Sequence, residues 1–513
     1  MLLESQIITH VQDEVDTKAF RHCGVDFWPL VRMRICQLVY CHRVNLPIVE
    51  ATAGGAGRRV YAGLPLPAKA WLFLKRLAHR ALCARRQARL LRQMRSQAPV
   101  DVLFLSREQY HSEIMDGAWY DRCVDPFVEL AQGRFRHLKV EVTEEPRRTP
   151  RRHKTIFIDP NDARYKAGAR LSSPRQPTAA FLKGLSTAAR VLADAGIHGG
   201  LEAHGLLCQV EEVLLYRDLL AEVLKAARPK AVFFTCIVDL VSMGAVAACK
   251  QLGITSVEIH HGYAGNNHSL YTHHRSVPPQ GFQLLPDLSW MWSEDSAKAF
   301  GSWYPPDSPH QFLAGGNLWL AKWVGQNPLP TPQEHAHFLD SLPKGKRVVL
   351  FSDGWGEPIV QQFPETLIET MRQSQSDCIW LIRLHPNYRE KEEEISKLLR
   401  ANGVNTFEIS HSTQCPLPAL LRITDHHVTR FSSVFFEAKQ FGLHTTMIAE
   451  MAEVYFTEYQ ADPMLHFCRD PKEIARNVRT CPREEQAASL LVRPPGEVLA
   501  LFTRIVTGKM TRH

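Results

Sequence analysis

The chain has 513 residues, of which 45% are hydrophobic and 22% are charged. This composition excludes a wholly disordered or collagen-like protein, and the length predicts two to four domains of about 100–200 residues each. The 61 Lys and Arg outnumber the 53 Asp and Glu, which gives a net charge of +8. This modest excess fits an anionic ligand or an anionic membrane surface, and it is too scattered to indicate nucleic acid.

The 12 cysteines are dispersed, and no two lie closer than five residues apart, so the chain has no C-x-x-C zinc or redox motif. Several lie in apolar runs, where a reduced cysteine packs as a small hydrophobe. The N-terminal sequence MLLESQIITHVQDEVDTKAF carries acids where a signal peptide is basic and apolar, and no uncharged apolar run is long enough to span a bilayer. We therefore expect a cytoplasmic protein, at most peripheral on the inner face of the cytoplasmic membrane.

Residues 1–98 are predicted to form an N-terminal helical region. Apolar residues recur at helical spacing within 24–43, and a Gly-rich break follows at 53–63. The segment 66–95 then carries nine Lys and Arg and no acid, with apolar residues such as Trp71 able to form one stripe. This pattern is typical of an interfacial helix on anionic lipid, and equally of a solvated basic helix packed on its neighbour.

From residue 99 the pattern changes to alternating strands and helices. The helical spacing of 239–253, which ends at Gly253, joins two strands into a βαβ unit. The basic, proline-broken interval 145–177 predicts a surface loop or lid. The strands predicted in this half are 100–106, 137–142, 231–235, 256–261 and 288–293.

A second boundary falls at 325–346, after which the alternation starts again. The predicted strands are 347–352, 378–384, 426–431 and 445–450, and the predicted helices are 364–374, 388–403, 432–442 and 494–506. Alternation of this kind predicts parallel sheets covered by helices, with a ligand cleft at the carboxyl ends of the strands. The expected fold is therefore α/β, with two Rossmann-like domains at 99–325 and 326–480, the helical extension at 1–98 and a closing helix within 481–513.

Three predicted strand ends in the second half carry residues with a chemistry of their own. They are Asp353-Gly354, Arg383-Leu384-His385-Pro386, and Ser432-Ser433 at the start of a helix. Serine hydroxyls and free helix N–H groups together suit a phosphate, although Ser is also a common helix cap without any ligand. Pro386 holds His385 on extended backbone, and a buried core histidine is the plain alternative there.

Taken in this order, the three strand ends resemble the nucleotide-binding half of GT-B glycosyltransferases. The resemblance is specific over residues 347–450 and is greatest to enzymes with cytidine-activated donors. Among them are bacterial sialyltransferases, capsule Kdo transferases and the CDP-glycerol glycerophosphotransferases of teichoic acid synthesis. In the first half, His261-Gly262 after a predicted strand is similar to the His-Gly of the last two groups. Ser352 stands where the sialyltransferases have a second acid.

The resemblance implies the GT-B fold and a glycosyl or polyol-phosphate transferase for a surface polysaccharide. The donor would be CMP- or CDP-linked and bind the second domain, and a glycan or lipid-linked acceptor would bind the first. No cofactor is implied. His385 would donate a proton or hydrogen bond to the leaving phosphate, and either His261 or Asp353 would be the base. The residues implied in donor binding are Arg383, His385, Ser432, Ser433 and Gly262.

Metal chemistry is not expected in this reaction. The five histidines within 260–274 lack a carboxylate or cysteine set at ligand spacing, and no Asp-x-Asp follows a predicted strand. Two other functions stay open at this point. One is a nucleotide-sugar epimerase or hydrolase of the same architecture, which needs no polymer acceptor. The other is a non-catalytic subunit of a polysaccharide assembly complex, because fold does not fix chemistry.

Overall fold

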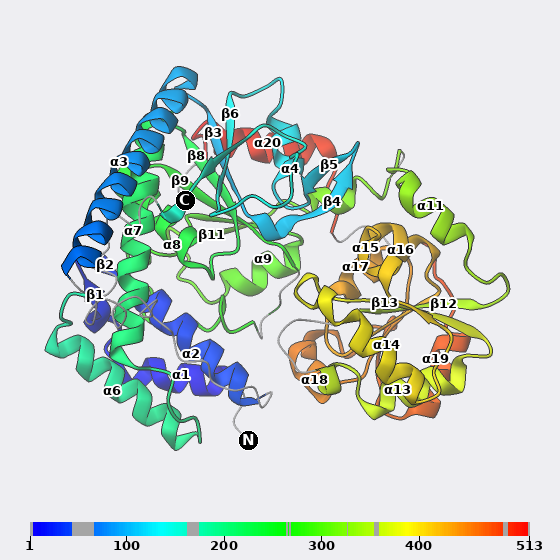
Figure 1. The fold of residues 1–513 in the computed structure, drawn as a ribbon. Helices are drawn as coiled ribbons and strands as arrows, with labels where there is room; N and C mark the ends of the chain where they lie inside the picture. Colours follow the sequence, from blue (N-terminus) through cyan, green and yellow to red (C-terminus); the bar gives the residue numbers. More distant parts are fainter. Residues whose placement is uncertain are drawn as a thin grey trace.

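A computed structural model describes residues 4–43, 66–161, 174–262, 265, 268–325, 327–352, 359–485 and 491–510. In these residues the chain builds a seven-stranded and a six-stranded parallel sheet, each covered by helices and lying side by side in Figure 1. This is the predicted α/β architecture of two Rossmann-like parallel-sheet domains. The predicted helical extension packs mainly on the first domain, with α1 and α2 at the lower left of Figure 1 and α3 along its left side.

The first sheet has the strand order β11-β10-β9-β8-β3-β6-β7, and all of its pairs are parallel. Its central strands are buried along their whole length, as expected of a parallel sheet with helices on both faces. The strands are β3 Val102–Ser106, β6 His137–Val142, β7 Thr155–Ile158, β8 Ala231–Thr235, β9 Thr255–Ile259, β10 Leu288–Met291 and β11 Gln311–Ala314. The helices around it are α4 Asp125–Ala131, α7 Ala203–Ala227, α8 Leu240–Leu252, α9 Glu294–Gly301 and α10 Leu318–Ala321.

The prediction of a surface loop over 145–177 is wrong for the part that forms strand β7. Strand β7 lies inside it and forms an edge of the first sheet, because Thr155–Ile158 alternates buried and half-buried residues that pair with β6. Arg151, just before β7, has a side chain that is only 3% exposed. The remainder of the interval, at 162–173, lies outside the described residues.

The N-terminal helices share one hydrophobic core with the first sheet. Buried Arg32 ties them to it by donating to the carbonyl oxygens of Leu270 and Thr272. Glu4 accepts hydrogen bonds from the hydroxyls of Ser269 and of Tyr455 in the second domain. The elements are α1 Glu4–Glu14, η1 Thr17–Phe20, β1 Arg21–His22, β2 Val25–Asp26, α2 Trp28–Arg43, α3 Leu66–Gln97 and α6 Ala179–Asp194.

The second sheet has the strand order β14-β13-β12-β15-β16-β17, again with parallel pairs only. Its strands are β12 Arg347–Ser352, β13 Cys378–Arg383, β14 Phe407–Glu408, β15 His426–Thr429, β16 Thr445–Met447 and β17 Leu465–Phe467. The two-residue β14 and three-residue β17 are edge strands too short to show a period in the sequence. The helical elements are α11 Gln333–Asp340, α12 Ile359–Gln362, α13 Glu365–Ser374, η4 Pro386–Lys391, α14 Glu392–Ala401, α15 Ser410–Gln414, α16 Leu417–Ile423, α17 Val434–Gln440, α18 Glu450–Tyr455, η5 Thr457–Tyr459 and α19 Pro471–Thr480.

Two segments cross between the domains. One is the hairpin of β4 His111–Met115 and β5 Ala118–Asp121, which follows η3 Glu108–Tyr110 and reaches toward the second domain. Its Tyr120 packs on Trp319 of α10, with ring centroids 5.4 Å apart, in a hydrophobic cluster that includes second-domain residues. The last helix, α20 Pro495–Val506, returns to the first sheet and packs Phe502 between the rings of Phe104 and Phe233. Among the described helices, none is both long and apolar enough to cross a bilayer.

Candidate active-site cleft

The carboxyl ends of β9 and β15 bring the two domains together. The loop after β9 holds His261 and Gly262, and the loop after β15 holds Ser432 and Ser433. A Cβ atom on Gly262 would lie 3.5 Å from the Ser433 hydroxyl oxygen, so the two loops stand almost in contact across the domain boundary. Parallel strands in facing sheets produce this meeting of loops, because their carboxyl ends all point to the same cleft.

The two adjacent histidines after β9 have different surroundings. His260 is buried between the rings of Tyr271 and Phe300, and its backbone carbonyl accepts a hydrogen bond from the Trp292 indole. His261 is exposed, and its ring lies 5.6 Å from that of buried Tyr110. The first residue after β9 thus belongs to the core, and the second lies at the surface of the cleft.

Desolvation between the domains lowers the pKa of His261 to about 4, and the positive charge of Arg122 adds to the shift. Desolvation and Arg122 likewise lower the pKa of half-buried His385 to about 4. Both imidazoles are therefore neutral at neutral pH, and each offers one nitrogen lone pair and one N–H group. A bound phosphate would raise both pKa values, because its negative charge favours the imidazolium form.

The two serines after β15 differ in how they are used. The Ser432 hydroxyl accepts a hydrogen bond from the backbone N–H of Val434, 3.3 Å away, and so caps the first turn of α17. Ser433 occupies the N-cap position itself, but its side chain makes no capping bond. Capping thus accounts for Ser432 and not for Ser433, whose hydroxyl faces Gly262 across the cleft.

Arg383 has a structural task that its sequence position does not reveal. Its guanidinium donates to the carbonyl oxygens of Ser412 and Cys415, and so fixes the end of α15 beneath the cleft. Its charge still acts inside the site. Burial raises the pKa of Glu437, and the positive charges of Arg122 and Arg383 partly oppose that shift.

Two residues that sequence reasoning missed complete the cleft. Arg122, after β5, and Glu437, on α17, line a cavity together with His260 and His261. The cavity measures about 40 Å³, enough for a few water molecules and too small for a sugar ring, because each water needs about 10–15 Å³ by this measure. Glu437 comes four residues after Ser433, one helical turn further along, and that spacing is the signal that could have found it.

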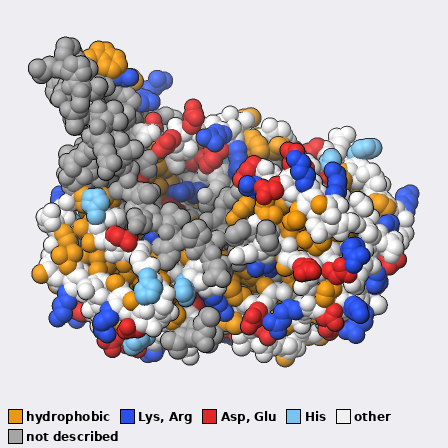
Figure 2. Space-filling view, turned by 60° about the horizontal axis from the view of Figure 1, so that its bottom comes forward, with side chains coloured by type: hydrophobic (Ala, Val, Ile, Leu, Met, Phe, Trp, Pro, Cys, Tyr) orange, Lys and Arg blue, Asp and Glu red, His pale blue; other side chains and the backbone are white. Residues whose placement is uncertain are grey.

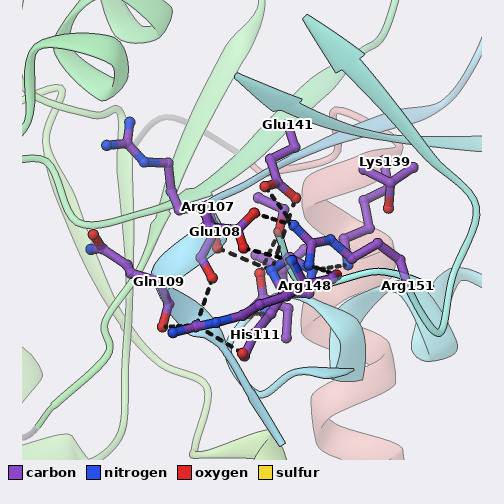
Figure 3. A network of polar contacts seen from close by, with 12 residues as sticks. Arg107, Glu108, Gln109, His111, Lys139, Glu141, Arg148 and Arg151 are labelled. Carbon is purple, nitrogen blue, oxygen red and sulfur yellow. Dashed lines mark hydrogen bonds and ion pairs between the residues drawn. The ribbon is translucent and has the colours of Figure 1, made fainter. Parts of the chain in front are cut away.

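Beneath the first-domain wall lies a network of buried charges, shown in Figure 3. Arg151 donates to the carboxylates of Glu108 and Glu141, and Lys139 pairs with Asp125 while contacting His111. Burial raises the pKa of Glu141 to about 7, although Arg151 opposes the shift. The network joins η3, β4, α4 and β6 to Arg151 in one support.

Arg148 extends this support toward the second domain. Its guanidinium donates to the backbone carbonyls of Glu108, Gln109 and His111. Burial lowers the pKa of Arg148, and the charge of Arg389, on η4 of the second domain, lowers it further.

Asp353 lies outside the described residues, and its role as a base stays a prediction. Among the described residues one group of three potential metal ligands comes together, formed by His444, His466 and Cys481. It does not include the 260–274 histidines. Two of these, His268 and His273, have pKa values lowered to about 4 by burial, and each ring packs on an aromatic neighbour.

No protein-family model and no curated protein matches the chain. Solved structures resemble it at low identity. The UDP-GlcNAc 2-epimerase from Neisseria meningitidis bound to UDP-GlcNAc is 13% identical, with a TM-score of 0.45 over 79% of this chain and 99% of that one. The UDP-GlcNAc 2-epimerase from Methanocaldococcus jannaschii is 11% identical, with a TM-score of 0.45 over 79% of this chain and 99% of that one. The wall teichoic acid polymerase TagF gives 11% and a TM-score of 0.40, over 87% of this chain and 92% of that one.

Proposed function

We propose that this protein transfers a glycosyl or polyol-phosphate unit from a cytidine-activated donor to a surface-polysaccharide or lipid-linked acceptor. The observation that carries the proposal is the position of His261, exposed on the first-domain wall, next to the close approach of Gly262 to Ser433 on the second. A transferase needs a base and a phosphate-binding group on opposite sides of the reacting centre, and these two loops supply them.

In this proposal His261 is the base. Its neutral imidazole accepts the proton of an acceptor hydroxyl while the hydroxyl oxygen forms its bond to the activated centre of the donor. The bond from that centre to the nucleotide phosphate breaks in the same step, and the nucleotide leaves with the bonding electron pair. Base catalysis of this kind contributes about 10²–10⁴-fold to a rate. Asp353 remains the second candidate for this proton.

The departing phosphate acquires negative charge that the cleft must neutralise. Ser433 and His385 would donate hydrogen bonds to it, and Arg122 supplies a positive charge from the first domain. Preorganised donors of this kind stabilise the transition state because they need no reorientation as the charge develops. The reaction is proposed to need no metal ion, and activity should therefore persist in excess EDTA and show no requirement for Mg²⁺ or Mn²⁺.

Thermal shift with CMP, CDP, UDP and GDP tests the donor class, because a ligand that binds the native state raises the melting temperature. CMP or CDP should give the largest shift, and Ser433→Ala and His385→Ala should reduce it without changing the melting temperature of the free protein. His198→Ala is the matched control, since His198 is an exposed imidazole on the first domain. A larger shift with UDP, accompanied by epimerised or hydrolysed nucleotide sugar without any acceptor, would support the epimerase or hydrolase instead.

Helix α3 supports a contact with a membrane surface, where a lipid-linked acceptor would reside. Trp71, Leu74 and Leu82 on this helix are 59%, 63% and 52% exposed. The helix carries no acid, whereas Lys and Arg alternate with Asp and Glu over the second domain, on the right of Figure 2. Exposed apolar side chains on a basic helix favour anionic lipid, which attracts the charges and admits the apolar groups.

Vesicle co-sedimentation tests this contact. The protein should bind vesicles that contain anionic lipid more tightly than neutral vesicles, and the Trp71→Ala, Leu74→Ala variant should bind them more weakly. Leu182→Ala on α6 removes an equally exposed leucine, 46% accessible, and serves as the control. Equal sedimentation of all three proteins would assign α3 to the packed, solvated helix that the sequence also allows.

A further inference from the structure

His444, His466 and Cys481 meet at the amino-terminal edge of the second sheet, opposite the cleft. His444 precedes β16, His466 lies on the neighbouring β17, and Cys481 follows α19. Nδ1 of His444 lies 3.0 Å from Nε2 of His466, which lies 3.7 Å from the Cys481 sulfur. The three potential ligand atoms all lie within 4.8 Å of one another.

We propose that these three side chains bind one Zn²⁺ ion. In a tetrahedral zinc site, two nitrogens lie about 3.3 Å apart, and a nitrogen and a thiolate sulfur about 3.6 Å apart, as the Zn–N and Zn–S bond lengths require. The observed separations of 3.0 and 3.7 Å are close to these edges. Imidazole and thiolate together are the ligand types that Zn²⁺ prefers.

Glu484 orients the first ligand. Its Oε1 atom lies 3.3 Å from Nε2 of His444, on the far side of the ring from the other two ligands. A carboxylate there accepts the Nε2–H and leaves the Nδ1 lone pair directed at the ion. Zinc-binding histidines characteristically have this carboxylate behind them. The nearby imidazole of His466 is partly exposed, as is Cys481, so a water molecule can reach the fourth position.

The ligand chemistry requires a proton to leave when the ion binds. The Cys481 thiol would release its proton to Zn²⁺, because the thiolate is the form that ligates a metal, and each imidazole would bind through a nitrogen lone pair.

The ion would fasten the segment by which the chain leaves the second domain. Arg347 donates to the Cys481 carbonyl, and the backbone N–H of Glu484 donates to the carbonyl of Gly442. Further along, the carbonyl of Leu491 accepts a hydrogen bond from the backbone N–H of Asn317 on the first-domain side. Residues 481–484 are therefore the second-domain end of the return connection, and Zn²⁺ would hold that end in place.

The metal content of the full-length protein tests the proposal. Protein purified without chelator, or exposed to Zn²⁺ and desalted, should hold one Zn²⁺ per chain. The Cys481→Ser and His466→Gln variants should lose at least tenfold in affinity. Cys468→Ser, which alters another cysteine of the same domain, should bind as the parent does. Equal zinc retention by parent, Cys481→Ser and His466→Gln would overturn the proposal, as would a parent that holds none.

A second measurement does not depend on how well the variants fold. Co²⁺ added to the chelator-treated parent should give the thiolate-to-cobalt charge-transfer band and the visible bands of a tetrahedral site, and Zn²⁺ should displace both. Zn²⁺ should also raise the melting temperature of the treated parent. A cobalt spectrum without a thiolate band would overturn the assignment of Cys481. Neither result depends on transferase activity, so the zinc site and the proposed function can fail separately.

Discussion

The carboxyl edges of the two sheets differ in how their charged and polar side chains are paired. At the first sheet, Arg151 and Lys139 are buried and each is paired with a carboxylate. At the second sheet, Ser433 makes no capping bond and His385 is half-buried beside the positive charge of Arg122. Paired buried charges fix a wall rigidly, whereas polar side chains at the surface of a cleft can contact a ligand. We therefore expect the buried ion pairs of the first edge to support the cleft, and Ser433 and His385 of the second edge, with His261 and Arg122 of the first domain, to act on the proposed ligand.

Removing a charge from the first edge should have the largest effect. Arg151→Met leaves Glu108 and Glu141 without their cation, and breaking a buried pair in this way costs about 3–5 kcal/mol of unfolding free energy. The cost should be greater at pH 8 than at pH 5, because protonation relieves the two carboxylates. Urea denaturation measures both. Arg152→Met, next in sequence but paired at the surface with Asp116, should change stability by less than about 1 kcal/mol. Similar losses in both variants would contradict a specific support role.

The pH dependence of the unfolding free energy should be dominated by histidines that lie at the two sheet edges. The folded state lowers the pKa of His111 in the network, and of His261 and His385 in the cleft, to about 4. The unfolded chain binds these protons near pH 6.5, and the folded chain binds them only near pH 4. The unfolding free energy that these histidines contribute is therefore complete above pH 6.5 and decreases as the pH falls to 4.

Buried carboxyl groups oppose this trend, among them Glu141 and Glu258. Burial raises the pKa of both Glu141 and Glu258 to about 7, so the folded state holds their protons more tightly and loses stability as the pH rises from 4.5 to 7. The histidines outnumber them, and we expect the urea midpoint to decrease from pH 6.5 to 4. A midpoint that stays level or increases over this interval would show that these imidazoles are not held neutral.

Removing a charge from the cleft should weaken binding more than it weakens the fold. Arg122→Met should reduce affinity for the nucleotide by about 10- to 150-fold, the value of one charge-assisted hydrogen bond. Arg122 also favours the charged form of buried Glu437, so a small decrease in the melting temperature of the free protein is expected. Arg134→Met, at an exposed arginine of the same domain, is the control. Calorimetric titration with CMP distinguishes them, and unchanged affinity in Arg122→Met would remove Arg122 from the site.

The smallest effect is expected at Gly262. A Cβ there would meet only the Ser433 hydroxyl at 3.5 Å, an ordinary contact, so Gly262→Ala should change stability by less than about 0.5 kcal/mol. Gly442 makes the contrast, because its φ is +75° and a Cβ would lie 2.2 Å from the Glu484 carbonyl oxygen. Gly442→Ala should cost about 1–3 kcal/mol. Equal melting temperatures in the two variants would contradict this difference.

The sequence by itself determined the two parallel sheets, because their strands are short apolar runs separated by helices of clear 3.6-residue period. It also located the cleft, since carboxyl ends of parallel strands share one edge. Strand β7 escaped prediction because prolines and arginines precede it, and one of those arginines, Arg151, proves to be buried in ion pairs rather than solvated. The charge of an arginine in the sequence does not show whether the folded protein will bury it beside a carboxylate.

Only the tertiary structure decided the tasks of individual side chains. His260 and His261 are adjacent and identical in type, and the packing of Tyr271 and Phe300 around His260 makes that residue part of the core while His261 stays exposed. Arg383 is used to hold α15, and Arg122 and Glu437 meet from different domains. His444, His466 and Cys481 are separated by 22 and 15 residues and carry no motif. Contacts between distant segments depend on how the strands are ordered in the sheet, and local patterns do not encode that order.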